Sequence, residues 1–212
     1  MRLIISSLLC LSFLFSYSQD TIRIKHTEYT TVFSKSLKYP ILVQWWTTKA
    51  KVTCVTPLKR VDSFSPDPKL YEESSLSVDY RGSGLDRGHV TPAADNLCGG
   101  KKVMEECFYF TNMIPQYHAL NAGDWKTLET LTRQIASQKD SVMVWAGAFG
   151  VQSKIGRVSV PTKCWKVIYV KKDNEYQCYV FENNKNKQLG LPSHKISLEE
   201  MEKLTGFKFS IN

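Results

Sequence analysis

One segment of this chain, residues 121–139, has the pattern of a long amphipathic helix, and β-rich segments lie on both sides of it. Trp125, Leu128, Leu131 and Ile135 follow at spacings of three and four, which places them on one helical face. Runs rich in β-branched and aromatic residues are typical of strands. Such runs are PILVQWWTT, KVTCVTP, CFYFTNM, SVMVWAGAF and residues 165–182. This order predicts an α+β fold with a mixed-strand core around one principal helix.

The segments between these elements give further expectations. Residues 19–38 are polar with weak alternation and predict an irregular N-terminal arm. Residues 57–84 are dense in Pro, Ser, Asp and Gly and predict a long loop, and long loops in compact domains are usually functional. A last helix is expected after Ser197, where Glu200 completes a capping box.

The first residues have the layout of a secretory signal peptide. Arg2 precedes an apolar run from Leu3 to about Phe15, and small residues at Ser16 and Ser18 predict cleavage after residue 18. We therefore expect a single domain over residues 19–212, exported to the periplasm or the extracellular space, with no membrane segment in the mature form. Loss of Arg2 lowers the net charge from +8 to +7, which favours polyanionic partners but does not identify them.

Five cysteines would remain in the mature chain, and an odd number leaves at least one unpaired or bound to another molecule. They are Cys54, Cys98, Cys107, Cys164 and Cys178. Strands 165–182 around a turn at 172–175, with residue 169 opposite 178, would not bring Cys164 to face Cys178. Cys98 and Cys107, which flank Gly99 and Gly100, are the favoured pair, although the sequence leaves the connectivity open.

The segment Asp86-Arg87-Gly88-His89 carries side chains suited to phosphodiester hydrolysis. A neutral imidazole can take a proton from water near neutral pH, so His89 is a candidate general base. Arg87 lies two residues earlier and would share a face with His89 on an extended segment, which places a permanent cation beside the base. Gly88 permits close backbone approach or an unusual dihedral angle. A plain turn would account for the same residues.

Asn121 and Glu129 are a second pair of candidates. The carbonyl oxygen of Asn121 is a hard ligand suited to Mg²⁺, and Glu129, two helical turns later, could reach a water of that ion. Asn121 could equally be a helix N-cap, and Glu129 could form an exposed pair with Arg133.

Three segments together resemble the DNA/RNA non-specific endonucleases, the ββα-metal family of the Serratia nuclease and endonuclease G type. They are DRGHVTPAAD, FTNMIPQ and LNAGDWKTLE, and the resemblance extends from about Trp45 to Phe209. It implies a ββα-metal finger, also called the His-Me finger fold. The cysteines of CGGKKVMEEC, residues 98–107, are not part of the family signature.

The resemblance also implies roles for particular residues. His89 would be the general base, Asn121 the only direct protein ligand of one Mg²⁺, or of Mn²⁺ in its place, and Glu129 the holder of a metal-bound water. Arg87 would bind the scissile phosphate. Arg60 matches another phosphate-contacting arginine, and Asn112 matches a position at the active site that orients water or phosphate.

We therefore expect a secreted, metal-dependent endonuclease that acts on DNA and RNA with little sequence or sugar specificity and leaves 5′-phosphate ends. One alternative is an inactive relative that only binds nucleic acid. Another is a phosphoesterase of small substrates, although the carboxylates do not cluster near His89 as two-metal sites require. The sequence leaves open a monomer or a homodimer, an inhibitor protein, the preferred strand form and the biological role.

Overall fold

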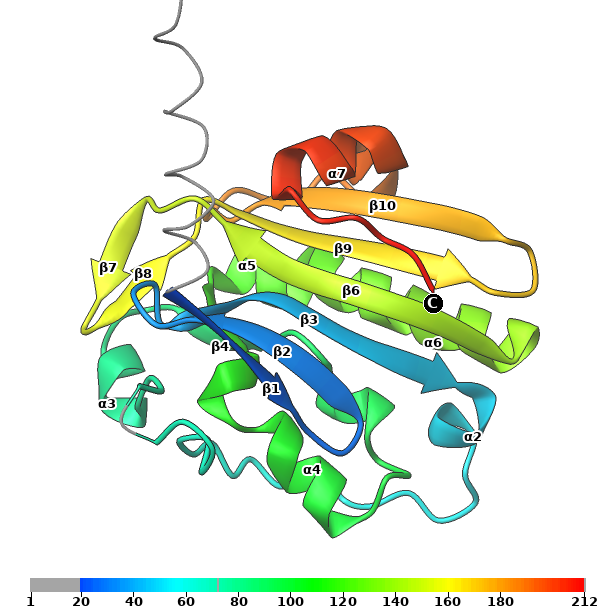
Figure 1. The fold of residues 1–212 in the computed structure, drawn as a ribbon, viewed down its shortest axis with the longest axis horizontal. Coiled ribbons are helices and arrows are strands. Elements are labelled where there is room, and N and C mark those ends of the chain that lie inside the picture. Colours follow the sequence, from blue (N-terminus) through cyan, green and yellow to red (C-terminus); the bar gives the residue numbers. More distant parts are fainter. Residues whose placement is uncertain (1–19, 72, 212) are drawn as a thin grey trace, which may run out of the picture.

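A seven-stranded antiparallel sheet runs through the molecule in the order β1-β2-β3-β6-β9-β10-β11 (Figure 1). The computed structural model of the protein describes residues 20–71 and 73–211, so the expected signal peptide at 1–18 lies outside the described residues. The strands are β1 (Thr21–Lys25), β2 (Tyr29–Ser34), β3 (Tyr39–Thr48), β6 (Ser141–Phe149), β9 (Lys163–Val170), β10 (Glu175–Glu182) and β11 (Lys195–Ile196). The central strands β3, β6 and β9 are buried along most of their length, as their continuous apolar runs predict.

Both faces of this sheet are covered. Helix α6 (Lys126–Lys139) runs behind the sheet in Figure 1 and buries Leu128 and Ala136, while the C-terminal segment passes in front. On that segment Phe209 packs edge-on against Trp145 and Trp165, with ring centroids 5.7 and 5.6 Å apart. The core therefore forms between the sheet and these two covers, and α6 is the principal helix that the sequence predicts.

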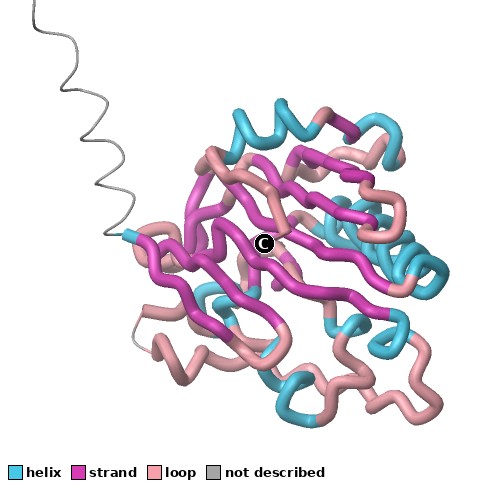
Figure 2. The backbone as a smooth tube through the Cα atoms, turned by 45° about the vertical axis from the view of Figure 1, so that its right-hand side comes forward, coloured by secondary structure: helices cyan, strands magenta, loops and turns pink. Residues whose placement is uncertain are grey.

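A second, smaller unit of strands carries the DRGH segment. Strand β4 (Asp86–His89) pairs antiparallel with β5 (Met113–Gln116), and the chain then leads into α6, which gives the ββα order. The remaining short elements connect these parts. They are α2 (Lys49–Val52), α3 (Ser77–Tyr80), η1 (Ala93–Asp95), α4 (Lys101–Cys107), η2 (Phe110–Asn112), α5 (His118–Leu120), η3 (Asn121–Trp125), β7 (Ser153–Ile155), β8 (Val158–Val160), η4 (Leu191–His194) and α7 (Leu198–Thr205). The fold is α+β, and Figure 2 shows how much irregular backbone gathers beneath the sheet.

Several elements form as the sequence predicts. Ser197 caps α7. Its hydroxyl oxygen accepts from the backbone N–H of Glu200 at 3.2 Å, and the Glu200 carboxylate accepts from the backbone N–H of Ser197. Residues 57–84, all described except residue 72, are mostly loop, and α3 is the one helix among those described. In the described part of the chain no helix is both long and apolar enough to span a membrane.

Other predictions are wrong, each for a local reason. Residues 19–38 are not an irregular arm, because β1 and β2 form a hairpin at the sheet edge, where one polar face is tolerated. The run KVTCVTP is not a strand: its first residues form α2, and the backbone is irregular beyond Val52. The helix expected over 121–139 is broken at Gly123, whose φ of −95° and ψ of −119° are not helical.

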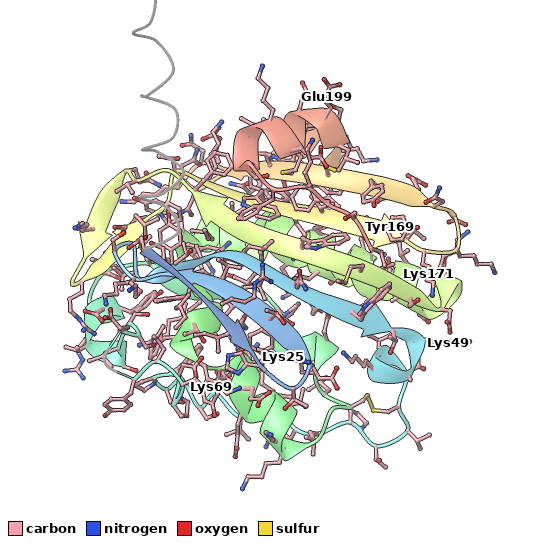
Figure 3. All side chains as sticks on the ribbon, in the orientation of Figure 1. Lys25, Lys49, Lys69, Tyr169, Lys171 and Glu199 are labelled. Carbon is pink, nitrogen blue, oxygen red and sulfur yellow. A yellow bond between two sulfur atoms is a disulfide. The ribbon has the colours of Figure 1, made fainter. Side chains whose placement is uncertain are left out.

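The cysteines also pair differently from the expectation. Cys54 bonds to Cys98, which ties the end of α2 to the loop before α4 and is drawn in yellow in Figure 3. Cys107 is a free, buried thiol in α4 and not the partner of Cys98. Cys164 and Cys178 do not pair, as predicted, but the register places Cys178 opposite Val167, two residues from the expected one.

Candidate active site

A cleft of about 290 Å³ brings together five of the six residues that the sequence singles out. Its walls come from the loop before α3, the strand β4, the short helix η1, and the consecutive helical segments η3 and α6. The cleft is lined by Arg60, Arg87, His89, Pro92, Ala93, Ala94, Asn121, Ala122, Lys126, Glu129 and Arg133. The sixth predicted residue, Asn112, is not among them.

His89 ends strand β4, opposite Met113 of β5, and its ring is held by aromatic neighbours. It packs edge-on against Phe108 with centroids 4.7 Å apart and lies 5.5 Å from Phe64. Its Nε2 atom is buried without a hydrogen-bond partner in the described part of the chain, whereas Nδ1 is not among the buried unpaired atoms. Burial, together with the nearby charge of Arg60, lowers the pKa of His89 to about 3, so the imidazole is neutral.

Gly88 is required by a close approach rather than by an unusual dihedral angle. A Cβ atom at this position would lie 1.9 Å from Oε1 of Gln116, whose side chain is fully buried against the strand. A larger residue here would collide with this buried amide, so the Gln116 side chain or β4 itself would have to shift.

Arg87 and Arg60 place two guanidinium groups in the cleft. Arg87 lies between the rings of Phe64 and Tyr80, with its Cζ 5.1 and 5.7 Å from their centroids, and its buried Nε has no hydrogen-bond partner among the described residues. Arg60 bonds Asp62 at 2.6 Å, but both side chains are more than half exposed, and such pairs are weak. Both guanidinium groups are therefore available to bind an anionic group in the cleft.

Asn121 is oriented by Asp86, the first residue of the DRGH segment. Its Nδ2 donates to Oδ2 of Asp86 at 2.8 Å, and Nδ1 of His118 lies 2.9 Å from the same oxygen. The amide nitrogen is therefore engaged, which leaves the carbonyl oxygen of Asn121 as the available ligand atom. Asn121 has αR dihedral angles and caps no helix with its side chain.

Glu129 lies half-buried on the first turn of α6, where several charges surround it. Burial raises its pKa above the usual range and Asp95 adds to this, while Lys166 and Arg133 oppose it. Arg133 bonds Asp95 at 3.1 Å, and no ion pair joins it to Glu129 among the described residues. The carboxylate of Glu129 thus lines the cleft without an ion pair to Arg133.

Asn112 does not reach the cleft, which corrects its expected contact with water or phosphate. It is fully buried: its Oδ1 accepts from the Thr91 N–H at 2.9 Å, and its Nδ2 donates to the Thr91 and Cys107 carbonyls at 2.9 and 2.8 Å. Both N–H groups of the amide and one lone pair of its oxygen are thus engaged with backbone. Asn112 holds the chain that follows His89.

Lys126 and Arg133 also line the cleft, although no sequence motif assigned them to the site. They lie three residues before and four residues after Glu129 on α6, and this spacing places all three on one helical face. The sequence already contains this spacing, and it is the signal from which two more cations could have been predicted in the site.

The donor set fits a hydrated divalent ion. Within residues 20–71 and 73–211, no His, Cys, Asp or Glu side chains gather in threes around a possible metal position. The cleft offers the carbonyl oxygen of Asn121 and the carboxylate of Glu129, which are hard oxygen ligands. Mg²⁺ keeps several waters and accepts few protein ligands, so these residues suit it.

Comparison with known proteins gives a consistent result. A sequence model of the DNA/RNA non-specific endonucleases matches residues 11–212. The mitochondrial nuclease EXOG of Xenopus laevis is 32% identical over 170 residues, which are 69% of this chain and 46% of that protein. A nuclease of Nostoc sp. is 32% identical over 173 residues, covering 73% and 61%, and human mitochondrial endonuclease G is 30% identical over 173 residues, covering 73% and 58%. The chain thus spans about half to three fifths of the length of these relatives.

The fold is also found among solved structures. A chain in the crystal structure of the EndoG/EndoGI complex matches with a TM-score of 0.80 at 24% sequence identity. The match covers 97% of this chain and 93% of that chain, so the likeness extends over nearly the whole architecture.

Proposed function

Because this chain belongs to the family of DNA/RNA non-specific endonucleases, we propose that it is a metal-dependent endonuclease of DNA and RNA with little sequence or sugar specificity. The observation that carries the proposal is the convergence of Arg60, Arg87, His89, Asn121 and Glu129 in one cleft. A base, phosphate-binding cations and hard oxygen ligands are what phosphodiester hydrolysis requires.

In this proposal Arg87 and Arg60 bind the phosphate on either side of the base. The aromatic rings beside Arg87 hold its guanidinium without neutralising it, so its charge is available to the substrate. Contacts to phosphate carry no information about bases, which agrees with low sequence specificity. Binding through the phosphate also leaves the sugar unread.

His89 takes the proton of the attacking water through Nδ1, since neighbouring atoms cover Nε2. Its lowered pKa keeps the ring neutral and able to accept. A phosphate bound beside Arg60 would offset the charge that lowers this pKa and would strengthen the base when substrate is present. Attack in line with the leaving 3′ oxygen gives 5′-phosphate ends.

Asn121 and Glu129 would hold the Mg²⁺, Asn121 directly and Glu129 through water, and Mn²⁺ offers the same coordination chemistry. When bound, the ion supplies positive charge that stabilises the phosphate and the leaving oxygen. Asp86 keeps the Asn121 amide in the required orientation. Lys126 and Arg133 add positive charge to the cleft wall.

We further propose that the enzyme works in an oxidising compartment, the periplasm or the extracellular space. The Cys54–Cys98 disulfide supports this, because such bonds are rare in reducing cytosol.

Plasmid digestion tests the proposal. The protein should nick and linearise supercoiled DNA and degrade RNA with Mg²⁺, and EDTA should stop both. Polynucleotide kinase should label the product ends only after phosphatase treatment, because they already carry 5′-phosphate. His89→Ala should be inactive, whereas His118→Ala, a matched change of a histidine exposed beside the cleft, should retain activity. Equal rates for His89→Ala and the unmodified protein would refute the mechanism.

A further inference from the structure

A second cavity, of about 320 Å³, lies on the other side of the loop that supplies Arg60. It is lined by Leu58, Lys59, Val61, Ser63, Lys101, Met104 and Glu105. Along the loop, residues 58, 59, 61 and 63 line this apolar cavity, while Arg60 lines the catalytic cleft. The same stretch of backbone therefore contributes to the walls of both cavities.

The opposite wall is a face of α4. Lys101, Met104 and Glu105 have the spacing of helical neighbours and point toward the loop. Met104 is buried, whereas Leu58 is 38% and Val61 62% exposed. Apolar side chains of the cavity are therefore exposed to water, and covering them with a ligand is energetically favourable.

The loop is tied down at several points. The N–H of Leu58 donates to the Leu97 carbonyl at 2.8 Å, and Cys54 is bonded to Cys98. Arg60 lies over the ring of Phe108 at 5.5 Å. The cavity is thus held at a fixed place beside the catalytic cleft.

The charge around the apolar cavity identifies the occupant. Two lysines and one glutamate stand at the rim: Lys59 is exposed, and Lys101, with 89% of its side chain exposed, forms a weak 3.7 Å pair with Glu105, whose side chain is 50% exposed. Apolar walls with a net positive rim match a nucleotide, whose base has apolar faces and whose phosphate is anionic. A strand whose phosphate lies at Arg60 and Arg87 would pass this rim.

We propose that the apolar cavity is a substrate subsite that receives one unstacked nucleobase of a single-stranded DNA or RNA, next to the phosphate held in the catalytic cleft. This inference rests on the proposed function. Leu58, Val61 and Met104 give the cavity its apolar walls, and apolar contacts do not distinguish one base from another. A base in a duplex stays paired and stacked, so the subsite acts only on single-stranded or frayed substrate.

The experiment compares Leu58→Ser/Val61→Ser with Val55→Ser, a matched change on the same loop at a side chain that is 96% exposed and outside the cavity. The double variant should raise the KM for a single-stranded oligonucleotide by about five-fold or more, by analogy with the loss of one stacked base. The KM for a blunt duplex of the same sequence should stay near that of the unmodified protein, and Val55→Ser should change neither. A single-strand KM unchanged in the double variant, an equal rise on the duplex, or an equal rise with Val55→Ser would overturn the subsite.

Binding without cleavage separates this inference from the proposed function. In a His89→Ala background, an oligonucleotide containing 2-aminopurine should brighten on binding, because the probe fluoresces more when it is unstacked. Adding Leu58→Ser/Val61→Ser should abolish the increase. No cleavage by the unmodified protein would refute the proposed function alone, whereas no fluorescence increase with His89→Ala would refute the subsite alone. If the double variant brightens the probe equally, the occupant is not a base, and an apolar side chain of a protein partner is the alternative.

Discussion

Asp86 offers the sharpest test of how the site holds its metal. Its Oδ2 atom accepts from Nδ2 of Asn121 at 2.8 Å, and Nδ1 of His118 lies 2.9 Å from the same oxygen. Asp86→Ala removes the acceptor and frees the Asn121 amide to turn. The turned amide would present nitrogen, which cannot bind a cation, where the carbonyl oxygen is needed.

The magnitude follows from the lost bond. A hydrogen bond to a charged acceptor contributes about 1.5–3 kcal/mol. Its loss should therefore raise the population of the turned amide, relative to the required orientation, by a factor of about 10 to 150. Loss of a group that orients a metal ligand typically costs about 10- to 100-fold in metal affinity. We expect the Mg²⁺ concentration for half-maximal activity to rise by about that factor in Asp86→Ala, with a smaller rise in Asp86→Asn, which keeps an acceptor.

The assay is nuclease rate against Mg²⁺ concentration, together with calorimetric titration of Mg²⁺ into the protein without substrate. His118→Ala is the control, because it removes the other partner of Asp86 and leaves the bond to Asn121 in place. If Asp86→Ala binds Mg²⁺ as tightly as the unmodified protein, Asp86 does not orient the ligand and the reasoning fails.

Three further predictions test the surroundings of the cleft. Since the pKa of His89 is lowered from 6.5 to about 3, its ¹⁵N shifts in metal-free protein should stay those of neutral imidazole down to about pH 5. The unfolded state takes up that proton first, so the unfolding free energy should fall as pH drops from 6.5 toward 3, and less so in His89→Gln. Cys54→Ser/Cys98→Ser opens a loop spanning 44 positions and should lower the unfolding free energy in urea by about 2–4 kcal/mol, a result that Cys107→Ser should not reproduce. Asn112→Ala leaves three buried backbone groups unpaired and should destabilise by about 2–4 kcal/mol in the same assay; a stable but inactive variant would restore a direct role for Asn112 in the chemistry.

The parts of the fold that the sequence predicts are those with strong local periodicity. The apolar stripe of α6 and the buried runs of β3 and β6 carry their structure in the order of their own residues. The hairpin of β1 and β2 does not, because its polar residues become strands only when β1 pairs with β2 and β2 pairs with β3. The Cys54–Cys98 bond likewise depends on how two distant loops meet.

The candidate site shows the same division. Arg87 and His89 share a face because they alternate on one strand, and this was visible in four letters of sequence. Asn112 lies in a motif that resembles the family, yet only the structure shows that its amide is hydrogen-bonded to the backbone of Thr91 and Cys107. Motifs predict which segments converge, and they do not predict which atom of each side chain faces the substrate.

The site has two halves: the strand β4, which carries His89, and the helical segment η3–α6, which carries Asn121 and Glu129. Hydrogen bonds join these two halves directly. The indole Nε1 of Trp125, one helical turn before Glu129, donates to the His89 carbonyl at 3.1 Å. A second hydrogen bond joins the same two segments, because Nδ2 of Asn121 donates to Asp86 at the start of β4. Each half thus supplies a contact that places the reactive group of the other, so a shift of β4 would move the metal ligand together with the base. Loss of either bond should therefore lower both Mg²⁺ affinity and the rate at saturating Mg²⁺, whereas truncation of Arg60, which stands outside this pair of contacts, should weaken substrate binding and leave Mg²⁺ affinity intact.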